Sequence, residues 1–474
     1  MQKNLGRCSA MLFSSILFLF YFLPVTLFIY TIVPRRLKNP VLLIASIFFY
    51  SWGEPIYVIL MLFSAVFNYL MAIDIRREQI HNKTGKSTLI FTVIVNLFIL
   101  CFFKYYGFLM DTINDLLGTE IKYTALALPI GISFYTFQAL SYIFDVYRGN
   151  VHVQRNLLHF ALYLALFPQL IAGPIVKYKD IALQLEERTL TLEKFGEGTR
   201  RFLIGLGKKV ILANNLGAIH AAVTALPDQQ VSVLTYWIGI ICYTLQIYFD
   251  FSGYSDMAIG LGKMFGFEFL ENFNYPYISK TVTEFWRRWH MSLSTWFREY
   301  VYIPLGGNRV STKRHILNLL IVWSLTGLWH GASWNFVAWG LYYGILLILE
   351  KYFLGNHLEK CPASVQHIYT MLIVAIGWVF FSSETLTGAL QYLQVLFCAG
   401  GVPLADTMTL YLLRTNWVFL LLGILIATPE PMKQFEILRK RNGLLSTLLL
   451  LGLLALCTAY LVFSSYNPFL YFRF

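Results

Sequence analysis

Apolar runs long enough to cross a membrane recur along the whole chain, and short polar segments separate them. Basic residues at 34–38 and at 76–86 bracket two apolar runs, so both basic clusters are expected on one side, the cytoplasm. Further apolar runs lie at about 87–110, 231–260, 316–329 and 334–349, from 368, and at about 386–399 and 416–427. A basic loop at 433–441 precedes the last run, which ends near Tyr460. Since a span takes about 20 residues, the pattern predicts an all-α polytopic membrane protein with about eleven transmembrane helices plus re-entrant and interfacial helices.

Two apolar stretches contain proline, glycine and small polar residues, at 128–138 and at 167–174. Such residues mark kinks or close helix contacts, and backbone groups that they free need nearby partners. We expect kinked or broken helices there, and a packing role is the simpler interpretation than a binding site. Lys104, near the end of its run, is placed to snorkel to an interface.

Residues 177–200 are the most polar segment in this part of the chain and predict a cytoplasmic loop or surface helix. Residues 200–210 then mix basic and apolar side chains as an interfacial helix does. Lys208 and Lys209 could anchor this helix at the membrane surface or bind phosphate, and anchoring is the simpler explanation.

Composition supports the membrane class, with 57% hydrophobic and only 13% charged among 474 residues. No stretch is long and polar enough for a soluble domain, so residues 1–474 are expected to form one integral membrane domain. The net charge of +12 reflects positive-inside orientation rather than nucleic-acid binding. The six cysteines are scattered singly, without CxxC or metal-type spacing, so they are expected to be small core residues and no metal site is expected. The run from Met11 is a first span rather than a signal peptide, and either Met1 or Met11 could be the start.

Residues 246–260 carry polar side chains inside an apolar run, namely Gln246, Tyr248, Asp250, Ser255 and Asp256. Facing lipid would be costly for them, so they are expected to face the bundle interior or a water-filled cavity. Proton relay, substrate binding, support of a catalytic residue and mutual structural satisfaction all remain open.

If residues 284–300 form one helix, Trp286, Trp289, Leu293, Trp296 and Tyr300 make a single aromatic and apolar stripe. The remaining polar residues lie off that stripe, and Glu284 can pair with Arg288 at i,i+4. This amphipathic segment suits a cavity wall; the residues off its stripe are Glu284, Arg287, Arg288, His290, Ser294 and Arg298.

His330 follows the apolar run 316–329, and a helix rising 1.5 Å per residue puts it about 20 Å from the basic turn that ends at His315. That depth lies inside the hydrocarbon core, where an ionisable side chain is usually functional. A lone buried histidine is more often structural, but His290 supplies a second one. A neutral imidazole in an apolar tunnel can take a proton from an attacking hydroxyl.

Five motifs in order resemble the membrane-bound O-acyltransferase (MBOAT) family, and the nearest branch is the membrane subunit of bacterial alginate O-acetylation. They lie at Leu128–Tyr135, Pro168–Pro174, Tyr248–Ala258, Phe285–Ser294 and Gly327–Gly331. The resemblance covers about residues 11–395, and the spans in 396–474 rest on composition alone.

The resemblance implies a helical bundle around a central tunnel, in which a cytoplasmic acyl thioester meets an acceptor from the outer side. His330 matches the family's catalytic histidine. His290 matches the second position, which other branches fill with Asn or Asp, so an orienting or hydrogen-bond-donating role is expected. Donor-site or tunnel roles are expected for Trp286, Arg287, Arg288, Trp289, Ser294, Trp329, Asp250, Tyr248, Gln246 and Ser255. Arg287, Arg288, Lys208 and Lys209 could meet phosphates of the donor.

The function implied is an O-acetyltransferase subunit in the bacterial cytoplasmic membrane that acts in O-acetylation of an extracytoplasmic polysaccharide. The donor would be acetyl-CoA or a phosphopantetheine-carried acyl group, with no tightly bound cofactor, and the partner a secreted or membrane-anchored acetyltransferase. D-alanyl transfer to teichoic acid from a carrier protein is the alternative within the family. An ion-coupled transporter using Asp250, Asp256 and the histidines is the alternative from another class, although no internal repeat is visible.

Overall fold

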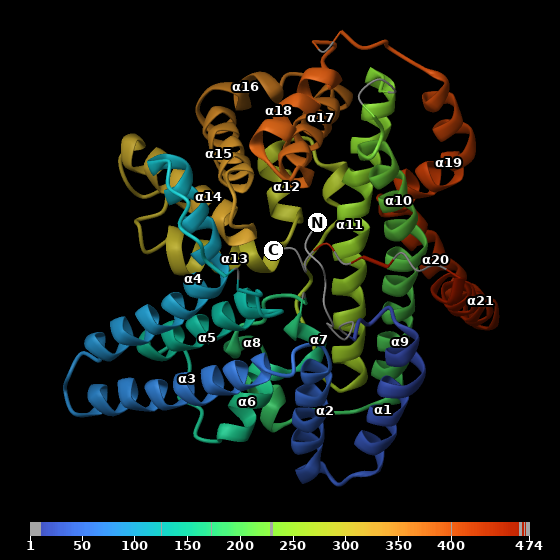
Figure 1. Ribbon diagram of the computed structural model, residues 1–474. Coiled ribbons are helices and arrows are strands. Elements are labelled where there is room, and N and C mark those ends of the chain that lie inside the picture. Colours follow the sequence, from blue (N-terminus) through green and yellow to red (C-terminus); the bar gives the residue numbers. More distant parts are fainter. Residues whose placement is uncertain are drawn as a thin grey trace. The chain divides into compact units, whose positions relative to one another are not determined.

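The computed structural model describes residues 11–124, 126–171, 173–227, 231–399, 401–463, 467–468 and 470. These residues form helices and connecting segments without a β-strand (Figure 1). The chain divides into two compact units, one within Met1–Phe202 and Ser255–Leu270, the other within Leu203–Tyr254 and Glu271–Phe474.

The first unit contains the helices up to α8, most of α9, whose residues from Leu203 belong to the second unit, and the end of α11. Their bounds are η1 (Phe18–Phe22), α1 (Leu23–Ile32), η2 (Arg35–Leu37), α2 (Lys38–Gly53), α3 (Tyr57–Ile80), α4 (Lys86–Leu117), α5 (Ile132–Tyr147), α6 (Leu157–Ala165), α7 (Phe167–Leu170), α8 (Tyr178–Glu186) and α9 (Leu192–Gly207).

The two glycine- and proline-containing stretches meet in this unit, as a packing role requires. Helix α5 begins after Gly131, whose φ is +76° and whose missing Cβ would lie 2.6 Å from the carbonyl oxygen of Leu170. The second stretch is broken, because α6 ends at Ala165 and α7 spans only Phe167–Leu170. The close backbone contact explains why a glycine stands at position 131.

Polar side chains within the spans of this unit are paired with one another. Asn68 of α3 and Asn96 of α4 exchange two amide hydrogen bonds, at 3.1 and 2.9 Å. Lys104 does not snorkel to an interface as expected, since it is buried and its Nζ lies 3.3 Å from Oγ of Ser133. Buried partners on neighbouring helices outcompete the membrane surface for these groups.

The second unit contains the helices from η3 onward. Their bounds are η3 (Lys208–Ala213), α10 (Asn214–Thr224), α11 (Val233–Met264, whose end belongs to the first unit), η5 (Pro276–Ile278), α12 (Val282–Arg288), α13 (Met291–Phe297), η6 (Arg298–Tyr302), α14 (Thr312–His330), α15 (Trp334–Leu349), η7 (Glu350–Leu354), α16 (Gly355–Leu358), α17 (Ala363–Ser382), α18 (Leu386–Leu396), α19 (Thr407–Ile426), α20 (Glu430–Arg441) and α21 (Gly443–Phe463).

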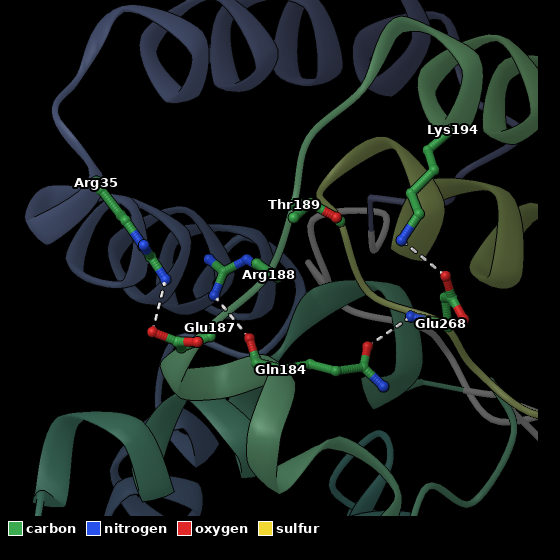
Figure 2. A pocket seen from close by; sticks show the side chains of 8 residues that line it. Arg35, Gln184, Glu187, Arg188, Thr189, Lys194 and Glu268 are labelled. Atoms are coloured by element: carbon green, nitrogen blue, oxygen red, sulfur yellow. Dashed lines mark hydrogen bonds and ion pairs between the residues drawn. The ribbon is translucent and has the colours of Figure 1, made fainter.

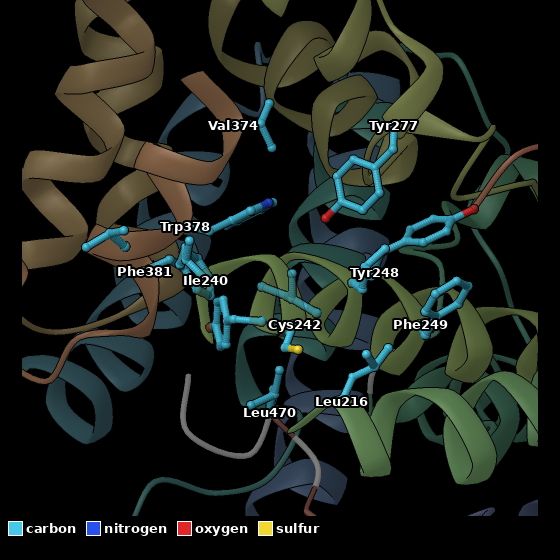
Figure 3. Close-up of a cluster of buried hydrophobic side chains, with 14 of the residues drawn as sticks. Leu216, Ile240, Cys242, Tyr248, Phe249, Tyr277, Val374, Trp378, Phe381 and Leu470 are labelled. Carbon is cyan, nitrogen blue, oxygen red and sulfur yellow. The ribbon is translucent and has the colours of Figure 1, made fainter. Parts of the chain in front are cut away.

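An aromatic core holds this second unit together (Figure 3). Trp289 packs against Trp378 of α17 with ring centroids 4.9 Å apart, and Tyr248 of α11 lies 5.2 Å from Tyr277. Large rings bury much apolar area with few rotatable bonds, so this core is both stable and rigid. It fixes the segments on either side of Trp289.

Helices α14 and α15 pack at backbone distance through glycines. A Cβ on Gly327 of α14 would collide with the carbonyl oxygen of Phe336 and lie 3.2 Å from Cα of Gly340 on α15. Small residues at such a crossing allow two helices to approach closely. Because Gly327 lies one turn before His330, this contact sets the position of the histidine.

Seven helices among the described residues are long and apolar enough to cross a membrane, and Phe18–Ile32 is a shorter apolar helix. The protein is therefore a multi-pass membrane protein, while the expected number of about eleven spans is not confirmed. The seven are Tyr57–Ile80, Lys86–Leu117, Leu192–Thr224, Trp334–Leu358, Ala363–Ser382, Thr407–Ile426 and Gly443–Phe463.

The span Leu192–Thr224 corrects the expectation of an interfacial helix at 200–210. Of the 18 residues in its most apolar stretch, 72% are buried. Lys209, which lies in this span, is 2% exposed. A lysine so deeply buried is not an anchor at the membrane surface. Its charge requires a partner inside the protein.

We expect Gly327→Val to lower the thermal midpoint of the detergent-solubilised protein, because the added side chain forces α14 and α15 apart. Overpacking of this kind costs on the order of 1–3 kcal/mol. The matched control is Gly452→Val in α21, where a Cβ would meet nothing within 4 Å. Equal midpoints for the two variants would show that the α14–α15 contact is not as tight as described.

Candidate active site

Both predicted histidines line one cavity in the second unit, with a volume of about 200 Å³. Its wall is mostly aromatic and aliphatic, and helices α12, α13 and α14 with η6 supply it. The lining residues are Trp286, His290, Leu293, Ser294, Phe297, Arg298, Tyr302, Leu319, Val322, Trp323, Thr326 and His330. A small apolar cavity with a few convergent polar groups is the usual form of a ligand site.

The helix expected over residues 284–300 is interrupted at His290. Helix α12 ends at Arg288, α13 begins at Met291, and His290 has φ +44° and ψ 53°, in the left-handed region. The prediction of one continuous aromatic stripe is therefore wrong, although all five of its members are buried. The expected pair of Glu284 with Arg288 is confirmed, with an N–O distance of 2.9 Å.

The segment 272–274 satisfies the backbone groups that this break exposes. The backbone N–H of Asn274 donates to the carbonyl of Arg288 at 2.9 Å, and that of Met291 donates to the carbonyl of Asn272 at 3.0 Å. At the other end of α12, the buried carboxylate of Glu350 accepts from the backbone N–H groups of Val282 and Thr283, at 2.6 and 2.8 Å. The helix before His290 is thus fixed at both ends.

Hydrogen bonds to Asn272 define the tautomer of His290. Oδ1 of Asn272 accepts from the backbone N–H of Ser292 at 3.2 Å and lies 3.1 Å from Nδ1 of His290. Because a backbone N–H can only donate, this side-chain atom must be the oxygen, and Nδ1 of His290 must carry the proton. Nε2 then has a free lone pair, and this buried atom has no hydrogen-bond partner among the described residues.

Of the two roles expected for His290, orienting and hydrogen-bond donation, this tautomer is compatible with the first and not with donation from Nε2. A neutral ring with its proton on Nδ1 presents an acceptor at Nε2. The sequence shows the histidine, but the partner that selects its tautomer lies 18 residues earlier.

His330 is the last residue of α14 and is 3% exposed. Its ring lies between aromatic rings, with centroids 5.0 Å from Trp339 of α15 and 5.3 Å from Phe381 of α17. The continuous helix Thr312–His330 confirms the helical spacing used to separate the histidine from the basic turn. Packing on several sides holds this imidazole in one orientation.

One part of the cavity wall is exposed and another is buried. Ser294 and Arg298 are exposed, whereas His290 and His330 are 1% and 3% exposed. Trp286 and Trp323 line the same cavity, with their rings 4.8 Å apart. A ligand entering beside Ser294 and Arg298 would occupy a cavity that also holds these rings and the two imidazoles.

Several predicted site residues lie outside this cavity. Trp289 and Tyr248 belong to the aromatic core, and Trp329 packs between the two histidine rings without lining the cavity. Gln246 packs against Gly217 of α10. Arg287 is exposed, Arg288 pairs with Glu284, and Ser255 is a buried residue of the first unit.

The two aspartates of α11 form ion pairs away from the cavity. Asp250 pairs with Lys209 at 2.5 Å, both side chains almost fully buried, and its second oxygen accepts from the backbone N–H of Leu470 at 2.9 Å. Asp256 pairs with Arg201 at 2.7 Å within the first unit. Lys209 is thus engaged inside the protein and is not placed to bind a donor phosphate.

Sequence reasoning did not assign site roles to several residues that build the cavity. Arg298 was visible only as a polar position off the aromatic stripe, and Asn272 only as part of a turn-rich loop. Leu319, Val322, Trp323 and Thr326 come from α14, and their one-face spacing at i, i+3, i+4 and i+7 before His330 was the signal available for them. Within the described residues, no group of three or more His, Cys, Asp or Glu side chains gathers as a metal site.

Known proteins that are similar to this chain agree with the family resemblance of the five sequence motifs. The probable alginate O-acetylase of Azotobacter vinelandii is 43% identical over 90% of this chain and 86% of its own length. The peptidoglycan O-acetyltransferase of Helicobacter pylori is 35% identical over 89% of this chain and 87% of its own. The teichoic acid D-alanyltransferase of Bacillus subtilis is more distant, 30% identical over 47% of this chain and 59% of its own.

The family model of the membrane-bound O-acyltransferases matches residues 152–388, which include both cavity histidines and the helices that carry them. Together with relatives above 30% identity that it covers nearly from end to end, this match shows that the chain belongs to the membrane-bound O-acyltransferase family.

Proposed function

We propose that this protein is a membrane O-acetyltransferase of the bacterial cytoplasmic membrane that passes acetyl groups from a cytoplasmic thioester for O-acetylation of an extracytoplasmic polysaccharide. The names of its full-length relatives, an alginate O-acetylase and a peptidoglycan O-acetyltransferase, support the acetyl group and the polysaccharide acceptor. The multi-pass fold supports a reaction that joins the two sides of a membrane.

The observation that carries the proposal is the shared cavity of His290 and His330. Two imidazoles converge on a small apolar space, away from the charged side chains of α11. Hydrogen bonds to developing charge are worth more in such a dry site than in water. The cavity volume of about 200 Å³ suits a short acyl group.

In the proposed reaction, the acceptor hydroxyl oxygen attacks the thioester carbonyl carbon. A C–O bond forms, the C–S bond breaks, and the hydroxyl proton passes to the imidazole of His330 and then to the departing thiolate. His330 acts as general base, a role that contributes about 10²–10⁴-fold in enzymes.

The tautomer of His290 gives this residue a different part in the reaction. With Nε2 as acceptor, it can accept a hydrogen bond from an N–H or O–H group of the acceptor molecule other than the attacking hydroxyl, whose single proton goes to His330, and so orient the attacking oxygen toward the carbonyl carbon. Asn272 fixes the imidazole of His290 through the hydrogen bond at Nδ1, on the side of the ring opposite Nε2. Asn272 is therefore a positioning residue, because it acts through the imidazole.

Arg298 at the exposed part of the cavity suits the donor side. A guanidinium there can bind a phosphate of acetyl-CoA or of a phosphopantetheine carrier. We propose a thioester donor of this class, with a secreted or membrane-anchored acetyltransferase as the partner that completes transfer to the polymer.

The alternatives receive less support. The D-alanyltransferase relative aligns with less than half of this chain. A transporter path through Asp250 and Asp256 would need these carboxylates to face a passage, but each is engaged in an ion pair.

His330→Ala should lower polysaccharide acetylation by about 100-fold or more, because the general base is removed. The measurement is labelled acetyl incorporated into polymer by cells that produce the variant at the wild-type level. The control is His357→Ala, which removes an exposed histidine. Acetylation retained by the His330 variant would refute the proposed base.

Asn272→Ala should reduce acetylation about tenfold, because the hydrogen bond that orients His290 is lost. Asn272→Asp keeps an oxygen at the Oδ1 position and should retain more activity than the alanine variant. Acetylation rate and thermal midpoint are measured for both. Loss of stability with an unchanged acetylation rate would assign Asn272 to the fold alone.

Arg298→Ala should raise the apparent KM for the acyl donor about tenfold while changing kcat little, because only donor binding is weakened. Labelled acetyl-CoA and a labelled acetyl carrier protein are compared as donors. Arg314→Ala, another exposed cation, is the control. An unchanged KM for both donors would remove Arg298 from the donor site.

A further inference from the structure

A second pocket lies in the first unit and has a different chemical character (Figure 2). Its volume is about 450 Å³, and its charged lining consists of Arg35, Arg188 and Lys194 with the carboxylates Glu187 and Glu268. Three cations and two anions leave the lining with one excess positive charge. No step of the proposed reaction uses this pocket.

Arg188 is held rigidly in the pocket. Its guanidinium lies 4.4 Å from the ring centroid of Phe267, and its Nε donates to the hydroxyl of Tyr30 at 2.9 Å. One terminal nitrogen donates to the carbonyl of Gln184 at 3.2 Å, while the other, Nη2, is buried and has no partner among the described residues. A pre-oriented guanidinium that lines the pocket is suited to attract an anion through its fixed positive charge.

Among the residues that the structure describes, the other two cations pair with exposed carboxylates. Arg35 lies 3.4 Å from Glu187, with side chains 67% and 83% exposed, and Lys194 lies 2.8 Å from Glu268. Lys194 also lowers the pKa of Glu268, chiefly through its hydrogen bond, so this carboxylate is ionised at neutral pH. Exposed ion pairs contribute little stability, so an incoming anion can displace these carboxylates at low cost.

We propose that this pocket binds the phosphate of an anionic phospholipid headgroup. Arg35 follows the apolar helix α1 by three residues, and Phe28 and Ile32 near the end of that helix are 66% and 65% exposed. Exposed apolar side chains leading to a basic pocket provide a path for an acyl chain with its phosphate at the polar end. Interfacial cations commonly bind lipid headgroups in this way.

The charge of the pocket favours a phosphodiester over free phosphate. Phosphatidylglycerol carries one negative charge, which matches the single excess positive charge of the lining. Inorganic phosphate is a mixture of singly and doubly charged forms near neutral pH, whereas a phosphodiester keeps one charge. The second charge of the doubly charged form would be left uncompensated beside Glu187 and Glu268.

The test uses the full chain in detergent, titrated with phosphatidylglycerol or phosphatidylcholine and followed by native mass spectrometry. The wild type should bind phosphatidylglycerol preferentially. Arg188→Gln and Lys194→Gln should each weaken this binding about tenfold, because each removes a charge-assisted hydrogen bond. Glu268→Gln should tighten it, since Lys194 is released. Lys194 and Glu268 are partly exposed, so their variants remain informative if Arg188→Gln does not fold.

Arg36→Gln is the matched control, because it removes an exposed cation beside Arg35 that does not line the pocket. Equal weakening in this control, or no preference for phosphatidylglycerol over phosphatidylcholine, would overturn the proposal. Inorganic phosphate is tested separately by its effect on the thermal midpoint. Stabilisation by phosphate that depends on Arg188 and Lys194, without preferential phosphatidylglycerol binding, would identify a soluble phosphate ligand and overturn the lipid assignment.

Discussion

A helix that breaks inside an apolar bundle exposes backbone groups with no water to bind, and the cavity depends on how these groups are satisfied. The break at His290 turns an imidazole into the cavity, and the segment 272–274 supplies backbone and side-chain partners on both sides of it. The same asparagine that completes the backbone hydrogen bonds also determines which ring nitrogen of His290 carries the proton. Folding and chemistry at this site therefore rest on one set of hydrogen bonds.

Buried charges elsewhere in the protein hold the scaffold rather than react. Lys209 and Asp250 compensate each other deep in the second unit, and Glu350 holds the start of α12 through backbone N–H groups. A buried charge without a partner destabilises the folded protein by several kcal/mol. Each of these groups is therefore held in place by its partner. The buried part of the cavity, by contrast, holds the neutral rings of His290 and His330, while its charged residue Arg298 is exposed.

The sequence predicted the fold class and the family, and it singled out His290 and His330 as candidate site residues, because apolar runs and long motifs are local signals. It did not predict the break at His290, since helical spacing was equally compatible with one continuous helix, and only the left-handed dihedral angles reveal the interruption. The contacts of Asn272 with His290 and of Lys209 with Asp250 join residues far apart in the chain. Such pairings depend on tertiary packing, so Lys104 and Lys209 were assigned to the membrane surface although both are buried.

The backbone at position 290 restricts which amino acids can replace the histidine. Side chains other than glycine rarely adopt positive φ, and asparagine, aspartate and histidine do so more readily than most. The resemblance to the family implies asparagine or aspartate as the alternatives at this position, which are the residue types that this conformation tolerates. The left-handed backbone at position 290 therefore limits which residues can evolve there, in addition to the chemistry that the site requires. The break in the helix can be retained while the side chain at this position changes.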